Sequence, residues 1–211
     1  MKSTACGVSN GIDSCYLLAK DLNCIMRLSL LIILLVVSGC WCFAQTNPPP
    51  PKATAEIMRE LRLKALGSAT NSNVRPSADY PLIRGVLMDW PIEKGTITVV
   101  SFSTGDASIY TTGTFGVIGG VAHENVRLAA QNFVKAAGRH YNEGMVTKDF
   151  AYPKAGRVRF YLICYHDVRM IDADLEAVRN GDGKCSDLYV EAQNVITQLR
   201  LVSEKSSGDK P

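Results

Sequence analysis

An apolar segment near the start of the chain limits which residues can belong to a folded domain. Residues 28–37 are apolar apart from Ser29, Arg27 precedes them, and Val37-Ser38-Gly39-Cys40 follows. A basic residue, an apolar stretch of about ten residues and an exit of small residues are typical of a secretory signal peptide. The pattern predicts an exported protein in which residues 1–44 form a leader and a signal or membrane segment.

Three fates of this segment remain open. Val37–Cys40 resembles the bacterial lipobox, whose cysteine is acylated, so a lipid on Cys40 would place the domain on a membrane surface. Cys42-Phe43-Ala44 offers small residues around an ordinary cleavage site before Gln45. Residues 28–44 are also at the lower length limit for an uncleaved transmembrane helix. We expect the protein to be exported. It would be attached to the cell membrane through Cys40 or residues 28–44, or would lie on the periplasmic or extracellular side of that membrane.

The residues before the apolar segment are unusual for an export signal, because they are polar and of mixed charge. Met26 followed by Arg27 would make an ordinary start. We therefore expect translation to begin at Met26. If Met1 is the true start, the long polar leader favours the uncleaved anchor.

A proline-rich stretch separates this segment from the rest of the chain. Residues 45–53 include four consecutive prolines, Pro48–Pro51. Such a run favours an extended polyproline II conformation, so it predicts a stiff stalk. We expect a single domain over residues 54–203 and a disordered tail over 204–211.

The spacing of apolar residues predicts the elements of that domain. Helices are indicated where apolar residues recur every three or four positions, and strands where they alternate or cluster with β-branched residues. The predicted helices span residues 54–66, 122–142 and 186–202. The predicted strands span 82–90, 96–103, 107–112 and 157–165, with a further short strand at 168–171 and a helical turn at 174–179.

The order of these elements predicts an α+β fold. Strands do not alternate regularly with helices, so a doubly wound parallel sheet is not expected. Short connections between the first three strands indicate an antiparallel meander. We predict an antiparallel sheet of about five strands with helices packed on it. This order resembles the profilin and roadblock type of small α+β domain, a topological likeness that implies no function.

Three short runs resemble an uncharacterised group of exported bacterial proteins. They are Gly85-Val86-Leu87-Met88-Asp89, the loop Gly116-Val117-Ile118-Gly119-Gly120 and the strand Gly156-Arg157-Val158-Arg159-Phe160-Tyr161. The resemblance covers about residues 80–203. It implies no activity.

Charge and cysteine content narrow the function classes. The formal net charge is +3 and no basic cluster is interleaved with aromatic residues, so we expect no nucleic-acid partner. Only Cys164 and Cys185 lie beyond the export segment. In an oxidising compartment they could form one disulfide. Alternatively, Cys164 is simply a small apolar residue in a strand.

A glycine-rich loop, Gly113–Gly120, is the best candidate site in the sequence. It leads from a strand to a helix N-terminus, where free backbone N–H groups favour an anion. Gly116, Gly119 and Gly120 would let a ligand approach the backbone, and His123 follows in the first helical turn. The loop lacks the lysine of a phosphate-binding loop. We therefore expect a structural role for the loop: a tight connection from strand to helix that packs the apolar residues of the loop into the core.

No other constellation points to catalysis. Cys164, His166 and Asp167 hold the elements of a thiol nucleophile, but residues two apart on a strand are about 6–7 Å apart. His123 and His140 lie about 25 Å apart along one predicted helix, so they cannot share a metal. We predict no catalytic residue, no metal and no cofactor.

The sequence as a whole predicts a membrane-tethered binding or assembly module with a protein partner. The alternative is a small exported enzyme or anion sensor using Gly113–Gly120 and His123.

Overall fold

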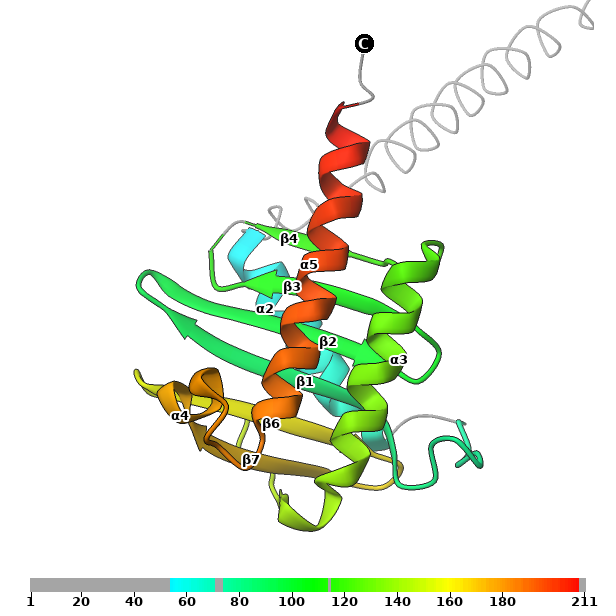
Figure 1. Cartoon of the computed structure of the whole chain (residues 1–211), viewed down its shortest axis with the longest axis vertical. Helices are drawn as coiled ribbons and strands as arrows, with labels where there is room; N and C mark the ends of the chain where they lie inside the picture. The colour runs from blue at the N-terminus through cyan, green and yellow to red at the C-terminus, as the bar shows by residue number, and fades with distance from the viewer. Residues whose placement is uncertain (1–53, 71–73, 114, 209–211) are drawn as a thin grey trace, which may run out of the picture. The chain divides into compact units, whose positions relative to one another are not determined.

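A computed structural model describes residues 54–70, 74–113 and 115–208, drawn in colour in Figure 1. The export segment with Cys40, the start site and the proline stalk of residues 45–53 lie outside the described residues, so those predictions remain predictions. Within the described ranges, no helix has the length and apolar character needed to cross a membrane.

A seven-stranded sheet forms the centre of the fold, with every neighbouring pair antiparallel. Its order is β4-β3-β2-β1-β6-β7-β5. The strands are β1 (Ile83–Ile92), β2 (Gly95–Phe102), β3 (Ala107–Thr111), β4 (Gly116–Ile118), β5 (Met145–Val146), β6 (Arg157–Cys164) and β7 (Val168–Asp174). The predicted α+β class with an antiparallel sheet is confirmed. The strand number is seven rather than about five, because β4 and β5 are short edge strands.

Helices cover both faces of this sheet. They are α2 (Thr54–Gly67), α3 (Glu124–Arg139), α4 (Leu175–Asn180) and α5 (Ser186–Gly208), with single 3₁₀ turns η1 (Ser68–Thr70) and η2 (Tyr141–Glu143). Helices α3 and α5 lie side by side on one face, and α2 lies on the other (Figure 1). The stripe Val126, Ala130 and Phe133 directs α3 onto the sheet, because residues three and four apart share one helix face.

Two hydrophobic cores follow from the alternation of side chains along the strands. In β6, Phe160 and Leu162 face α3 and α5, whereas Tyr161 and Ile163 face the side that α2 covers. Phe160 is 0% exposed, so the face of β6 that points toward α3 and α5 is buried. The opposite face of β6 is buried as well, so both helical layers are needed to cover the central strands.

Several predicted boundaries need correction. Helix α3 ends at Arg139, not at 142, because the chain tightens at His140, whose N–H bonds to the carbonyl of Ala137, and η2 follows. Helix α5 continues to Gly208, so the predicted disordered tail begins inside a helix. An ion pair between Arg200 and Glu204, one turn apart, supports this continuation.

Strand β1 also runs further than predicted, through Pro91 to Ile92. Strand β6 pairs with β1 only as far as Asp89, so one side of Pro91 has no neighbouring strand. A proline is tolerated at such a position because no hydrogen bond of the sheet depends on its missing N–H.

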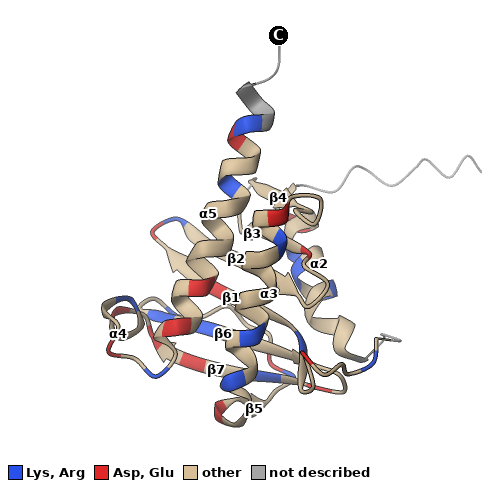
Figure 2. Ribbon diagram, turned by 45° about the vertical axis from the view of Figure 1, so that its right-hand side comes forward, with Lys and Arg blue, Asp and Glu red and all other residues tan. Residues whose placement is uncertain are grey.

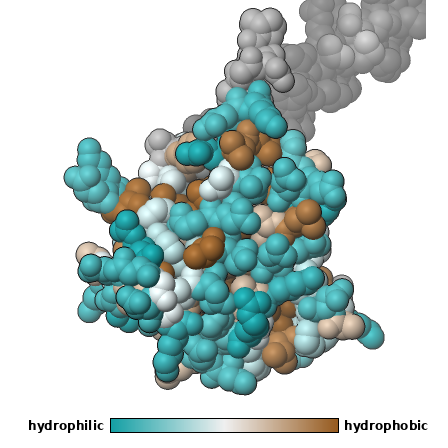
Figure 3. All heavy atoms as spheres, viewed as in Figure 1, coloured by the Kyte–Doolittle hydropathy of each residue, from teal (hydrophilic) through white to brown (hydrophobic). Residues whose placement is uncertain are grey.

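The surface of this domain is mixed in character. Figure 2 shows basic and acidic segments interspersed along the helices and strands. Figure 3 shows that the face carrying α3 and α5 is mostly hydrophilic, with scattered hydrophobic residues. The face in view therefore offers no broad apolar area, and specific chemistry must be sought in individual clusters of side chains.

Candidate functional site

The end of α3 and the start of α5 bring four chemically active side chains together. His140 Nδ1 lies 3.0 Å from Glu143 Oε1 and 3.8 Å from the Cys185 sulfur. The same sulfur lies 3.7 Å from Glu143 Oε2. On the far side of the imidazole ring, His140 Nε2 lies 2.8 Å from Asp187 Oδ1. The cluster therefore combines imidazole, thiol and carboxylate groups around one point.

A pair of tight turns places Cys185 in this cluster. Helix α4 ends at Asn180 and is capped by Gly181, which adopts a left-handed conformation with φ 87° that glycine accommodates without strain. The chain then folds back, because the N–H of Gly183 bonds to the carbonyl of Ala177. A Cβ at position 183 would lie 2.8 Å from Val178 Cγ1, so only glycine fits there. This turn delivers Cys185 immediately before the first residue of α5.

The opposite side of the cluster is a single 3₁₀ turn that is anchored to the sheet. Within η2, the N–H of Glu143 bonds to the carbonyl of His140 at 3.0 Å, which puts the two side chains on one turn. Arg169 of β7 donates to the carbonyl of Gly144 at 3.1 Å, and its guanidinium lies 4.1 Å from the centre of the Tyr141 ring. His140 and Glu143 are therefore held in place by contacts from a separate strand.

Burial divides the cluster into an inner and an outer part. Cys185 is 2% exposed and His140 is 8% exposed, whereas the side chains of Glu143 and Asp187 are 43% and 41% exposed. Burial, together with the Glu143 carboxylate, raises the pKa of the Cys185 thiol to about 12. A thiol that stays protonated is a poor nucleophile, so the surroundings do not favour covalent catalysis by Cys185.

The carboxylate of Asp187 is stabilised in its charged form. Burial alone would raise its pKa, but hydrogen bonds from Arg139 and His140 outweigh burial, and the pKa lies below the ordinary range. The Arg139 guanidinium donates to Asp187 at 2.8 Å. Asp187 is thus a charged acceptor that fixes the orientation of the imidazole ring.

The spacing of three groups in the cluster fits a metal ion. His140, Glu143 and Cys185 each offer one ligand atom, and these atoms lie within 4.8 Å of one another. In a tetrahedral zinc site, bonds of about 2.0–2.3 Å separate ligand atoms by about 3.3–3.6 Å. The observed separations of 3.0, 3.7 and 3.8 Å lie close to these values. Metal-ligating histidines usually donate their second ring N–H to a carboxylate, which is the position of Asp187.

A surface cleft opens beside this cluster. Its volume is about 460 Å³, and Glu143 and Cys185 line one part of it. Helix α4 contributes Ala177 to its wall, and strand β7 contributes Asp172. The cleft therefore gives solvent and small solutes a route to two of the three groups that are spaced for a metal ion.

The glycine loop is built differently from an anion site. Gly116 belongs to edge strand β4, and a Cβ there would lie 2.6 Å from the sulfur of Met58. A Cβ at Gly120 would lie 2.4 Å from Val126 Cγ1. These two glycines therefore allow close packing against the protein itself. Phe115 and Ile118 are 58% and 60% exposed, so the expectation that the apolar residues of the loop pack into the core is wrong for these two. Gly119 has φ 75° and open space around it, and its N–H lies 3.4 Å from Ser108 Oγ.

The remaining predicted residues do not join one site. His123 precedes α3 and lines a separate cleft of about 590 Å³ between α3 and α5, which none of the three loop glycines lines. Cys164 and Cys185 are both free and buried, so the disulfide that the sequence allowed does not join them in the structure. The pKa of Cys164 is raised to about 12, by burial first and Asp167 second, and His166 is exposed.

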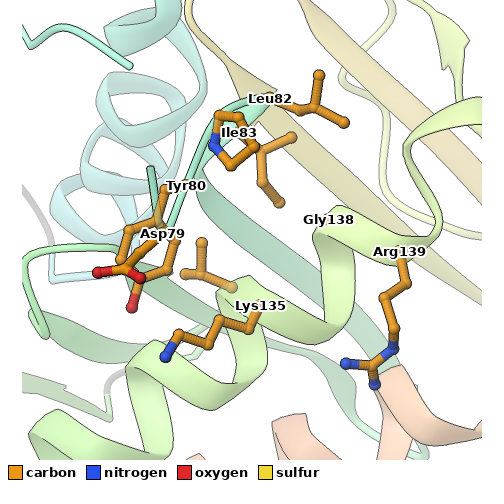
Figure 4. A pocket seen from close by; sticks show the side chains of 9 residues that line it. Asp79, Tyr80, Leu82, Ile83, Lys135, Gly138 and Arg139 are labelled. Atoms are coloured by element: carbon orange, nitrogen blue, oxygen red, sulfur yellow. The ribbon is translucent and has the colours of Figure 1, made fainter. Parts of the chain in front are cut away.

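A third cleft differs from the His140 cluster in how its polar side chains are oriented. It measures about 240 Å³ and lies between the segment Asp79–Ile83 and α3. Figure 4 shows Lys135 directed toward Asp79 and Tyr80, whereas Arg139 points away from them. Arg139 is instead paired with Asp187. Polar groups therefore diverge in this hollow, while they converge in the cluster around His140.

The comparisons with known proteins add no assignment: no family model, no curated protein and no solved structure matches this chain. The geometry of the His140 cluster is therefore the basis for assigning a function. Sequence reasoning missed the cluster, although His140 and Glu143 are three residues apart and Cys185 and Asp187 are two apart. Those spacings are the only local signal, and neither matches a known zinc motif.

Proposed function

We propose that this protein binds a divalent transition-metal ion of the zinc class through His140, Glu143 and Cys185. The observation that carries the proposal is the convergence of an imidazole nitrogen, a carboxylate oxygen and a sulfur within 4.8 Å. Nitrogen and sulfur ligands suit zinc and its neighbours in the first transition row, whereas magnesium and calcium take oxygen ligands.

The charges of the centre support this proposal. A metal ion requires the thiol in its deprotonated form, so binding would release the proton that burial and Glu143 otherwise keep on Cys185. The thiolate and the Glu143 carboxylate together carry two negative charges, which balance a divalent ion. Asp187 would hold the neutral imidazole with Nδ1 free for the metal.

Cobalt titration of the purified full chain tests the proposal. Cobalt(II) takes the place of zinc in such sites, and a thiolate ligand gives a charge-transfer absorption band in the near ultraviolet. We expect this band in the wild type and its loss in Cys185→Ser. Cys164→Ser is the matched control, because Cys164 is also a free, buried thiol. The cysteines before residue 45 are present in every variant, so the difference between variants reports on Cys185.

A second measurement uses stability. Zinc that binds only the folded protein raises the free energy of unfolding by about 2.7 kcal/mol at a concentration 100 times the Kd. The melting temperature should therefore rise with zinc in the wild type and Cys164→Ser, but not in His140→Ala. Equal cobalt bands in the wild type and Cys185→Ser would show that the cluster is only a structural network joining α3 to α5.

The same proposal includes the location of the module. We propose that it is exported and held at a membrane by a lipid on Cys40 or by residues 28–44, with the proline stalk projecting the domain toward a protein partner. The sequence patterns at Val37–Cys40 and Pro48–Pro51 support this. Cys40→Ser should release the protein from the membrane fraction or leave it unprocessed. Unchanged membrane association with an unmodified N-terminus at Gln45 would contradict the lipid anchor.

A further inference from the structure

The proposed metal centre has three protein ligands, one fewer than the four of a tetrahedral site. Structural zinc sites use four protein ligands, whereas sites that act on other molecules keep one position for an exogenous ligand. Within the part of the chain that the structure describes, only His140, Glu143 and Cys185 form a group of three or more spaced for an ion. Glu143 and Cys185 line the cleft of about 460 Å³, so a solute in the cleft lies beside two of the three proposed ligands.

Three carboxylates and two cations line this cleft: Glu143, Asp172, Asp174, Arg157 and Lys184. Glu143 is a proposed metal ligand, and Asp172 and Asp174 are paired with arginines. Arg157 is already paired, because its Nε lies 2.6 Å from Asp172 Oδ1 and its Nη1 lies 3.9 Å from Asp174. Lys184 also lines the cleft, directly beside Cys185. Among the described residues, no carboxylate lies within 4.0 Å of its ammonium group. Lys184 is thus a positive charge on the lining of this cleft, without an ion-pair partner among the residues that the structure describes.

We infer that a small anion enters through this cleft, completes the coordination of the metal and meets Lys184 as its counter-charge. The inference rests on the proposed metal site. A divalent ion and a nearby ammonium group both favour an anionic ligand over a neutral or cationic one. The cleft of about 460 Å³ has room for a small anion such as a carboxylate or a pseudohalide.

Azide titration of the cobalt-loaded full chain tests this inference. Azide is a small anion that changes the visible absorption of cobalt when it joins the coordination sphere. We expect a saturable change in the wild type. Lys184→Ala should weaken azide binding about fivefold, the effect of removing one favourable charge contact at a surface. Lys205→Ala is the matched control, because position 205 is 21 residues beyond Lys184 and lies about 28 Å along α5 from its first residue, Ser186.

A steric variant checks the route. Ala177→Phe places a large side chain in the wall of the cleft, so it should abolish the azide response while the cobalt–thiolate band remains. A thiolate band with no azide response in the wild type would overturn the inference and leave the metal site standing. Equal azide binding in the wild type, Lys184→Ala and Ala177→Phe would overturn the cleft as the route. Absence of the cobalt–thiolate band in the wild type would contradict both the proposed function and this inference.

Discussion

Arg62 and Asp89 form an ion pair between α2 and β1 that solvent does not reach. Their side chains are 2% and 0% exposed. Arg62 Nε lies 3.1 Å and 3.0 Å from the two carboxylate oxygens, and Nη2 also contacts Oδ2. The hydroxyl of Thr98 donates to the same carboxylate. This pair fixes α2 on the sheet face opposite α3 and α5.

The rest of the guanidinium group is also satisfied. Its Nη1 donates to the carbonyl of Phe150 at 2.9 Å, and its carbon lies 4.2 Å from the centre of the Tyr152 ring. Burial alone would lower the pKa of Arg62, but the hydrogen bond and the attraction of Asp89 raise it above the ordinary value. Arg62 therefore joins α2, β1 and the loop before β6 through one charged group.

Removing Arg62 should destabilise the protein severely. In Arg62→Ala, the Asp89 carboxylate stays buried without its counter-charge, which costs about 3–5 kcal/mol in comparable cases. We expect the free energy of unfolding, measured by urea denaturation, to fall by this amount. Replacing both partners, as in Arg62→Leu with Asp89→Leu, should cost less, because no buried charge is left alone.

An exposed ion pair supplies the control for burial. Arg157 pairs with Asp172, and their side chains are 41% and 28% exposed. Arg157→Ala should lower the free energy of unfolding by about 1 kcal/mol or less, since solvent screens the pair. If Arg62→Ala and Arg157→Ala lower the free energy of unfolding equally, burial does not determine how much the Arg62–Asp89 pair contributes to stability.

The larger core should be most sensitive at Phe160, which is 0% exposed. Phe160→Ala removes an aromatic side chain from close packing, so we expect the free energy of unfolding to fall by about 3–5 kcal/mol. Met145, which is 75% exposed in β5, provides the comparison. Met145→Ala should change stability by less than about 0.5 kcal/mol. A similar urea midpoint for both variants would mean that β6 turns its other face to this core.

The elements of the fold could be predicted because their signals are local. Phe160 and Leu162 alternate with Tyr161 along β6, and Val126, Ala130 and Phe133 recur at helical spacing in α3. The structure confirms these faces. The short strands β4 and β5 have no such signal, because two or three residues become strands only when β3 or β7 lies beside them.

The functional cluster could not be predicted for a different reason. His140 and Cys185 are 45 positions apart, and their meeting depends on how α3 and α5 cross the sheet. Arg62 shows the same limit. The sequence places it among charged residues on a helix, where it looks like a solvent-exposed side chain, but Asp89 draws it into the smaller core. Contacts of this kind exist only once the layers have packed.

Two glycines near opposite ends of α3 allow a sharp test of packing. In Gly120→Ala the new Cβ would lie 2.4 Å from Val126 Cγ1 and 2.9 Å from Leu199 Cδ2, two buried side chains. We expect a loss of about 1–3 kcal/mol from overpacking. Gly138, inside α3, has nothing within 4 Å of its Cβ position. Gly138→Ala should raise the free energy of unfolding by about 0.5–1 kcal/mol, and thermal melts would reveal the opposite signs. Destabilisation by both would contradict the packing argument.

The carboxylate of Asp172 should make stability depend on acid pH. Burial alone would raise its pKa, but hydrogen bonds from Arg159 and Arg157 outweigh burial and lower it. The stabilisation is present above the unfolded pKa of about 3.9 and is lost as the pH falls through the lower folded value. Screening limits it to about 1 kcal/mol or less. Urea midpoints of the wild type and Asp172→Asn should therefore differ at pH 7 and converge near pH 2. A constant difference would exclude ionisation of Asp172 as the cause.

Asp187 should control metal affinity without being a ligand. Its carboxylate accepts from His140 Nε2 at 2.8 Å, which leaves Nδ1 directed toward Glu143 and Cys185. Loss of such a contact typically weakens metal binding by about 10–100-fold. We expect Asp187→Asn to weaken zinc binding within this range, measured by competition with a chelator of known affinity. The cobalt–thiolate band should reach its full height at saturation, because all three ligands remain.

A matched variant separates this orientation effect from simple loss of charge. Glu191 lies one turn further along α5, so Glu191→Gln removes one negative charge close to the same place on the helix. Because a carboxylate at position 191 is not bonded to His140, zinc affinity should change by less than about threefold, the scale of a screened surface charge. If the two variants weaken zinc binding equally, the contribution of Asp187 is electrostatic at long range, and the hydrogen bond to His140 does not set the geometry of the centre.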